Sequence, residues 1–435
     1  MRLKIFLTAV QRFASVGIGV LTTVLLTNVM IAEQYGYYVY VLGLLALVIV
    51  PSQIGIPQFV LRETVRSIEA QDDVATRSVI RWGYIVVTLA GSIVVMGLMA
   101  FAHYWTPPNL GYLIILAAPL VLLTSWNAIR ASILRSHGWT ARSQFPENIV
   151  KPLVLLLVVL ALMIINSDEI TARQAIFANV IAMGVSFLLG VWLVQKIGAR
   201  RKTSSARYNH RVWLTATLGL GFSAALQAIS LNLNVVLLGG LGMIEEVAVF
   251  KVASLIGGQV GIVLQIANIV IAKHVGAALQ RGETKEVERL LARCSFFSST
   301  ASFFIVVCII AFGKAILSVA FPPIYKDAYL AMVILAASQF LNCMTGSVAL
   351  LFNLARREWV ITAALLASTL INIALNLALI PKFGIEGAAF ASLASLLSWN
   401  ILLYVRARNS LSMDVGFIAG LKDCIGHSKL WPNQR

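Results

Sequence analysis

The chain has 435 residues, of which 59% are hydrophobic and 12% are charged, and its mean hydropathy is +0.86. This composition cannot be enclosed in a water-soluble globule, so lipid is the expected solvent for most of the chain. The net charge of +16 does not indicate nucleic-acid binding, because the basic residues lie in short segments between long apolar runs.

The first apolar run, residues 13–31, follows a basic start that is similar to a signal peptide. It outlasts the apolar core of about 7 to 15 residues that is typical of such peptides, so we interpret it as a membrane span. A span needs about 20 apolar residues to cross a hydrocarbon core about 30 Å thick. The sequence therefore predicts an all-α polytopic membrane protein with about twelve transmembrane helices. The predicted spans are 9–31, 38–60, 79–102, 111–132, 146–165, 174–195, 213–238, 247–272, 294–312, 328–352, 359–380 and 386–405.

The loops between these spans differ sharply in charge. Of the 34 lysines and arginines, 28 lie in the termini and in alternate loops on one side, and four lie on the other side. Short basic loops stay in the cytoplasm, so this asymmetry predicts that both termini are cytoplasmic. An added or missing span would reverse every later loop, and the alternation therefore favours an even count of twelve.

The most basic loop, residues 196–212, lies between the sixth and seventh predicted spans. We expect an N-terminal six-helix bundle in 1–195, a cytoplasmic linker in 196–212, a C-terminal six-helix bundle in 213–408 and a cytoplasmic tail in 409–435. A shift of 212 residues superposes 33–81 on 245–293 without a gap. Halves with the same topology would be parallel repeats.

Signals for catalysis or for metal binding are not found in the sequence. The four cysteines show no CxxC or ligand-like spacing, and the five histidines are scattered. The sequence has no P-loop, and no external loop is long enough for a catalytic site with paired carboxylates. We therefore expect no disulfide framework, no metal, no cofactor and no enzyme activity.

Several spans carry polar and small residues at helical spacing, so that each set lies on one helix face. The sets are Arg12, Ser15, Gly19 and Thr22; Ser223, Gln227, Ser230 and Asn234; Lys251, Ser254, Gly258, Gly261, Gln265 and Asn268; and Gln339, Asn342, Gly346, Ala349 and Asn353. Such faces line a polar cavity in one interpretation and pack against other helices in the other. Both interpretations place them inside the protein.

Arg12 and Lys251 are cations within predicted spans, Lys251 about 6 Å from the predicted outer end. Each could meet an anionic substrate, or could extend along the helix to the lipid headgroups. No Asp or Glu lies in the middle of a predicted span. The spans therefore contain no obvious carboxylate that could exchange a proton or a sodium ion.

Four stretches resemble a known family. The first is EQYGYYVYVLGLLALVIVPSQIGIPQFVLRE, with a YG turn before the second span and RE after it. The second, NLARREWVITAALLASTLINIALNLALIPKFGIEGAAFAS, is similar to the family's penultimate hairpin, with Asn372 and Asn376 one turn apart. Together with EEVAVFKVAS and RGETKEVERLL, they resemble the polysaccharide-biosynthesis, or Wzx-type, flippases of the multidrug/oligosaccharidyl-lipid/polysaccharide exporter superfamily.

The resemblance implies two six-helix bundles around a central cavity, as in flippases and MATE transporters. It also implies alternating access, which moves undecaprenyl-diphosphate-linked oligosaccharides for O-antigen, capsule or exopolysaccharide across a bacterial cytoplasmic membrane. The expected partners are that substrate, membrane lipids and the glycan polymerase machinery, without nucleic acid. Candidate substrate-binding residues are Arg12, Lys251, Gln227, Asn234, Gln265, Asn268, Gln339 and Asn342. The alternatives are a MATE-like exporter of drugs or small metabolites, and a membrane glycan polymerase or ligase.

Overall fold

The computed structural model describes the chain except for residues 1, 54, 166–168, 197–209 and 429–435, together with some side chains of the first, tenth and last helices. Contacts within the chain divide it into two compact units, Met1–Gly239 and Gly240–Arg435. Every regular element of the described residues is helical. The all-α fold is therefore confirmed.

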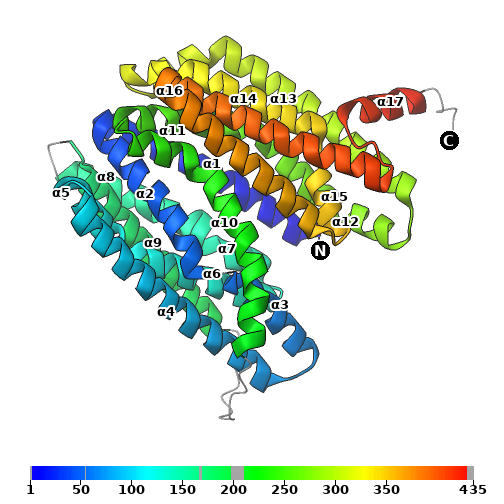
Figure 1. Ribbon diagram of the computed structural model, residues 1–435, viewed down its shortest axis with the longest axis horizontal. Coiled ribbons are helices and arrows are strands. Elements are labelled where there is room, and N and C mark those ends of the chain that lie inside the picture. Colours follow the sequence, from blue (N-terminus) through cyan, green and yellow to red (C-terminus); the bar gives the residue numbers. More distant parts are fainter. Residues whose placement is uncertain (1, 54, 166–168, 197–209, 429–435) are drawn as a thin grey trace. The chain divides into compact units, whose positions relative to one another are not determined.

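Among the described residues, the first unit holds ten α-helices and one π-helical segment, which Figure 1 colours from blue to green. They are α1 (Arg2–Val29), α2 (Ala32–Gln53), α3 (Ile56–Glu69), α4 (Asp73–Trp105), α5 (Pro108–Ala117), α6 (Pro119–Ser136), α7 (Thr140–Phe145), η1 (Pro146–Val150), α8 (Lys151–Ile165), α9 (Ala172–Gln195) and α10 (His210–Gly240). Packing groups α10 with this unit, although it begins the predicted C-terminal bundle. The division into two six-helix bundles remains a prediction.

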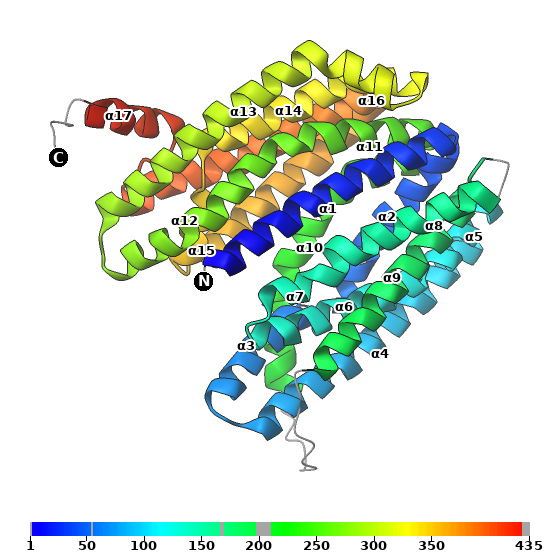
Figure 2. The ribbon, with the colours of Figure 1, turned by 180° about the vertical axis from the view of Figure 1, so that it is seen from behind.

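The second unit holds the remaining helices, coloured from green to red in Figure 1. They are α11 (Ile244–Gly258), η2 (Gln259–Gly261), α12 (Ile262–Gln280), α13 (Thr284–Ala320), η3 (Pro323–Asp327), α14 (Ala328–Thr345), α15 (Val348–Leu354), α16 (Glu358–Leu411) and α17 (Phe417–Ser428). Both views show α13 beside α14 (Figures 1 and 2). The tail predicted from residue 409 thus contains a helix of its own.

Ten helical stretches of the described residues are long and apolar enough to cross a membrane. The 54 residues of α16 count once among them, although non-helical torsion angles at Gly384 (φ 50°, ψ −127°) divide it between the two last predicted spans. A shorter apolar stretch, Ala14–Val29, matches the first predicted span. The chain is therefore a multi-pass membrane protein, and the count of twelve remains a prediction.

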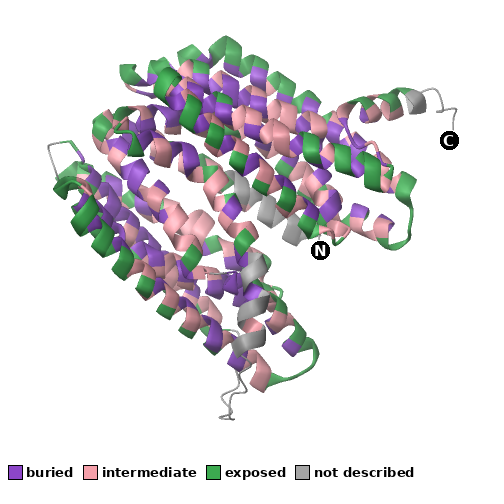
Figure 3. Cartoon of the chain, viewed as in Figure 1, coloured by how far each residue is buried: buried purple, intermediate pink, exposed green. Residues whose placement is uncertain are grey.

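Side chains on the outer faces of both units have the character expected for contact with lipid. On α4 the exposed positions include Leu89, Ile93 and Met96, and on α13 they include Phe297 and Phe304; all five are at least 60% exposed. Figure 3 shows such exposed positions along the outer helices of each unit. A protein in water would bury apolar surface on this scale. In a bilayer the surface can stay exposed, because lipid tails are as apolar as the side chains that face them.

Several predicted spans are interrupted helices. The second predicted span is divided into α2 and α3, where Gly55 has a left-handed backbone (φ 69°) that residues with a Cβ rarely adopt. The eighth contains the 3₁₀ segment η2 between α11 and α12, and the fifth contains the π-helical η1, which starts at Pro146. Interruptions of this kind occur at hinges and functional sites more often than elsewhere in helices.

The motif with Asn372 and Asn376 closes the hairpin inside α16. Asn372 Nδ2 donates to the carbonyl oxygen of Ala391 at 3.2 Å, and Asn376 Nδ2 donates to Asn372 Oδ1 at 3.1 Å. Both asparagines are buried. These residues therefore join the two arms of the hairpin within the second unit.

Candidate functional site

The predicted site residues of the first unit lie on α1 and α10. Arg12 is within α1, but its side chain lies outside the described residues. Gln227 is exposed on α10, whereas Asn234, two turns later, is buried. Beyond Asn234, α10 packs on α2: a Cβ on Gly43 would lie 2.8 Å from Val235 Cγ1, and one on Gly239 would collide with the Tyr40 ring. This end of α10 is a packing surface.

Lys251 is a cation within α11 of the second unit. Because α11 begins at Ile244, Lys251 lies seven residues into the helix, about 10 Å along its axis. Its side chain is half-buried, and no carboxylate of the described residues forms an ion pair with it. A lysine in this setting is a cation available to an anionic ligand, or to the headgroups at the membrane surface.

Gln339 and Asn342 are brought together on α14. Asn342 Nδ2 donates to Gln339 Oε1 at 3.5 Å, and Asn342 Oδ1 accepts from Asn400 Nδ2 of α16 at 3.0 Å. Asn400 is buried and also donates to the Leu396 carbonyl at 3.0 Å. The three amides form a polar chain from α14 to α16.

The polar face of α11 and α12 combines packing and open positions. Gly261 packs against α14, since a Cβ there would collide with Gln339 Oε1, whereas a Cβ on Gly258 would meet nothing within 4 Å. Gln265 is exposed, and the Oδ1 atom of the half-buried Asn268 has no hydrogen-bond partner among the described residues. Lys251 and Gln265 are 14 residues apart, about 21 Å along the axis, so one small ligand group cannot contact both.

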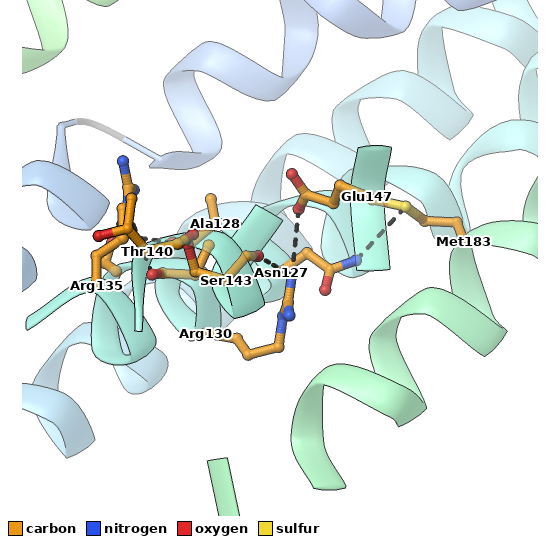
Figure 4. A network of polar contacts seen from close by, with 10 residues as sticks. Asn127, Ala128, Arg130, Arg135, Thr140, Ser143, Glu147 and Met183 are labelled. Carbon is orange, nitrogen blue, oxygen red and sulfur yellow. Dashed lines mark hydrogen bonds and ion pairs between the residues drawn. The ribbon is translucent and has the colours of Figure 1, made fainter. Parts of the chain in front are cut away.

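A cationic cluster of the first unit was not among the predicted site residues. Arg130 of α6 is fully buried, and its Nη2 atom lies 3.4 Å from the Ser143 carbonyl oxygen and 3.7 Å from Glu147 Oε1 (Figure 4). Glu147 of η1 also interacts electrostatically with Arg135 of α6 and with Lys151 at the start of α8. Of the three cations, Arg130 is the one with an ion pair to Glu147 among the described residues, whereas the Arg135 guanidinium donates to the Ala131 carbonyl oxygen at 3.3 Å and to Ser132 Oγ at 3.1 Å.

One signal in the sequence could have identified this cluster. Arg130 lies inside the predicted span 111–132, but it was grouped with the basic loop that follows. A side chain two residues from a span end can face either the headgroups or the protein interior, and sequence periodicity alone does not distinguish these environments.

Within the described residues, no three His, Cys, Asp or Glu side chains are placed to hold a metal ion.

Comparisons with known proteins agree on one family and one fold. The model of the family described as polysaccharide biosynthesis protein matches residues 2–279. No curated protein matches the chain. Among solved structures, an inward-facing multidrug resistance MATE family transporter of the MOP superfamily is similar with a TM-score of 0.72, at 14% identity over 98% of this chain and 100% of that one.

Two further structures have the same fold. The lipid II flippase MurJ, in an inward closed conformation, has a TM-score of 0.73 at 12% identity, over 99% of this chain and 94% of that one. A MOP superfamily transporter from Pyrococcus furiosus, whose title describes a binding pocket of reversed polarity, has a TM-score of 0.64 at 14% identity, over 98% and 96%. At such identities the likeness establishes the fold alone.

Proposed function

Because the chain belongs to the polysaccharide biosynthesis protein family, we propose that it is a flippase for a lipid-linked oligosaccharide. The cargo would be an undecaprenyl-diphosphate-linked repeat unit of O-antigen, capsule or exopolysaccharide. It would cross the bacterial cytoplasmic membrane by alternating access and undergo no chemical change. The match of the family model supports the glycan, and the similarity in fold to a flippase of lipid II supports a lipid-linked cargo.

The excess of cations within the helices is the observation that carries this proposal. Arg130 faces Glu147 only at 3.7 Å and keeps two guanidinium nitrogens without a hydrogen-bond partner, and Lys251 has no carboxylate partner among the described residues. Unpaired cations inside membrane proteins are costly and generally mark ion or substrate pathways. A diphosphate is a fitting cargo for such a pathway, because guanidinium and ammonium groups form strong charge-assisted hydrogen bonds to phosphate oxygens.

Polar amides without charge would serve the glycan. The chain of Gln339, Asn342 and Asn400 offers donors and acceptors in one line on α14 and α16. Amides can hydrogen-bond sugar hydroxyl groups without fixing the identity of the sugar. We therefore place the glycan, rather than the diphosphate, near these residues of the second unit.

Reconstitution tests the proposal directly. The purified full-length chain in vesicles should make a fluorescent lipid-linked oligosaccharide on the inner leaflet accessible to a glycosidase outside, in a protein-dependent manner. The same lipid without its diphosphate should move far more slowly. Movement of cationic drugs without movement of the lipid would favour the exporter instead.

A deletion strain provides the test in cells. Lipid-linked repeat units should accumulate on the cytoplasmic face of the membrane, and surface glycan should be lost. Accumulation on the outer face would contradict the proposal and select a glycan polymerase or ligase, because these enzymes act after translocation.

We place both termini in the cytoplasm and name the glycan polymerase as the partner that consumes the translocated lipid.

A further inference from the structure

The surroundings of Arg130 are unusual for a buried arginine. The side chain is 0% exposed, yet its Nε and Nη1 atoms have no hydrogen-bond partner among the described residues. Gly190 of α9 makes room for it, since a Cβ there would collide with the guanidinium. A buried guanidinium with unsatisfied donors is unfavourable unless an acceptor completes its hydrogen bonds.

The contact with Glu147 is a weak partnership. Its 3.7 Å separation from Arg130 Nη2 exceeds hydrogen-bonding distance, and the Glu147 side chain is 37% exposed. Glu147 is held in the π-helical segment η1 between Pro146 and Lys151 (Figure 4). The carboxylate is therefore a counter-ion that a stronger anion can displace without breaking a short hydrogen bond.

The three cations near Glu147 differ in burial. Arg135 is exposed at the end of α6, and its guanidinium is hydrogen-bonded within that helix, whereas Lys151 is half-buried and Arg130 is fully buried. All three lie on the side predicted to be cytoplasmic. Once Glu147 is displaced, Arg130 and Lys151 carry two positive charges, which match the two negative charges of a diphosphate linkage.

We propose that Arg130 and Lys151 form a binding site for the phosphate groups of the lipid-linked substrate, which Glu147 occupies as an internal counter-ion when the substrate is absent. This proposal rests on the proposed function, and it places the capture of the cargo in the first unit of the protein. The phosphate displaces Glu147 from Arg130, and Glu147 returns when the phosphate leaves. Neither state then leaves the buried guanidinium without an anion.

Opposite effects of two substitutions test the site. The probe is farnesyl diphosphate, titrated against the purified full-length protein in detergent. Lys151→Ala should weaken its affinity by about tenfold, as expected for the loss of one charge-assisted hydrogen bond. Lys151→Arg should restore most of the affinity. Glu147→Gln should strengthen binding severalfold, because it removes the competing carboxylate but keeps the shape of the side chain.

Arg142→Ala is the matched control. Arg142 lies on α7 between Arg135 and Lys151 in the sequence, but its guanidinium stacks 4.4 Å above the Trp139 ring. Its removal should leave the affinity unchanged. If the contact between Arg130 and Glu147 only stabilises the packing of α6 against η1, Glu147→Gln would lower the melting temperature and would not strengthen farnesyl diphosphate binding. That result would overturn the site.

Two further ligands identify the source of the phosphate. Farnesol should not bind measurably, and phosphatidylglycerol should compete only weakly; equal competition by phosphatidylglycerol would assign the cluster to lipid headgroups and overturn the substrate site.

The vesicle assay separates this proposal from the proposed function. Translocation by the native protein, with diphosphate affinity unchanged in both Lys151→Ala and Glu147→Gln, would refute the site alone. Absent translocation with the binding effects intact would refute the proposed function alone.

Discussion

Lys251 could serve either of two roles of a membrane lysine. It lies about 10 Å along α11 from the helix start, and about 6 Å inside the predicted span, which begins three residues later. An extended lysine at such a position can reach the headgroups or meet an anion within the membrane. Its role in substrate binding is a prediction that substitution decides.

Substitution of Lys251 tests this role. Lys251→Ala should reduce glycan export about tenfold or more at matched membrane abundance, because one charge-assisted contact to the diphosphate is lost. Lys251→Arg should keep much of the export. The measurement is surface glycan, with protein quantified in membranes. Full export by Lys251→Ala would contradict a role in substrate binding and would indicate that the lysine reaches the headgroups.

Residues of the candidate site differ in how far they could be predicted from the sequence. Gln339 and Asn342 were predicted because they share one face of a helix, and the structure joins them by a hydrogen bond. Their third partner, Asn400, is 58 residues from Asn342 along the chain, and only tertiary packing brings it near. The same limit applied to Arg130, since its burial depends on Gly190 in a different helix.

At the scale of elements, α11 and α14 approach closely at Gly257, whereas the adjacent Gly258 makes no such contact. A Cβ on Gly257 would lie 2.7 Å from the backbone oxygen of Met332 and 3.1 Å from the backbone nitrogen of Ala336. Backbone atoms cannot move aside as the end of a flexible side chain can. Gly257 therefore sets the distance between the helices, next to the 3₁₀ segment η2.

A pair of substitutions separates packing from general helix effects. Gly257→Ala should destabilise the second unit by about 1–3 kcal/mol, because it overpacks the contact between the two helices. Gly258→Ala should be neutral or slightly stabilising, since a Cβ there meets nothing within 4 Å and alanine favours helix. The measurement is the melting temperature in detergent. Equal losses from both variants would show that the glycines act through backbone flexibility instead.

The last helix, α17, is fastened to α13 by charge and by packing. Asp423 Oδ2 accepts a hydrogen bond from Arg293 Nε at 2.6 Å, and Asp423 Oδ1 lies 3.4 Å from Arg289 Nε. The Phe417 ring stacks on Phe296 at 5.5 Å. Helix α17 is thus an integral part of the second unit, a feature that the sequence analysis did not predict.

Weakening this attachment should make α17 more mobile. Asp423→Asn removes an ion pair that is partly exposed, so the expected cost is about 1 kcal/mol, and local opening should rise about fivefold. Alkylation of the native Cys424 under native conditions reports this opening. Lys422→Gln, at an exposed neighbouring position, should leave the rate unchanged. An unchanged rate in Asp423→Asn would mean that apolar packing alone holds the helix.

The existence of the long helices was predicted better than their interruptions or their ends, since α13 begins ten residues before its predicted span and ends eight residues after it. Runs of apolar residues located α4, α9 and α13 because length and hydropathy suffice to define a span. The same criterion cannot detect η1 or η2, since a π or 3₁₀ turn keeps the apolar character of its neighbours. Only Pro146 at the start of η1 offered a local signal, because proline cannot donate the helical hydrogen bond.

For the whole molecule, contacts between loops agree with the predicted alternation of sides. In the second unit, Asp423 of the tail meets Arg289 and Arg293, which were assigned to the same side as the tail. In the first unit, the Ile170 backbone nitrogen donates to the Val29 carbonyl oxygen at 3.0 Å, which joins the loop after the fifth predicted span to the outer end of the first. A wrong count of spans between such partners would place them on different membrane faces.

The absolute orientation is the final prediction, and single cysteines at exposed positions test it. Labels at Asn109→Cys, at the start of α5, should react in intact cells with an impermeant maleimide, since the predicted loop is external. Labels at Thr284→Cys, at the start of α13, should react only after the membrane is permeabilised. The native cysteines are replaced first, and export confirms that each variant folds. Protection of residue 109 together with labelling of residue 284 would show that the topology is the inverse of the predicted one. The 28 basic residues would then face outward, against the rule that retains short basic loops in the cytoplasm. In that case the cationic cluster around Arg130 would open to the outside, and it could release a lipid diphosphate there but could not capture one from the cytoplasm.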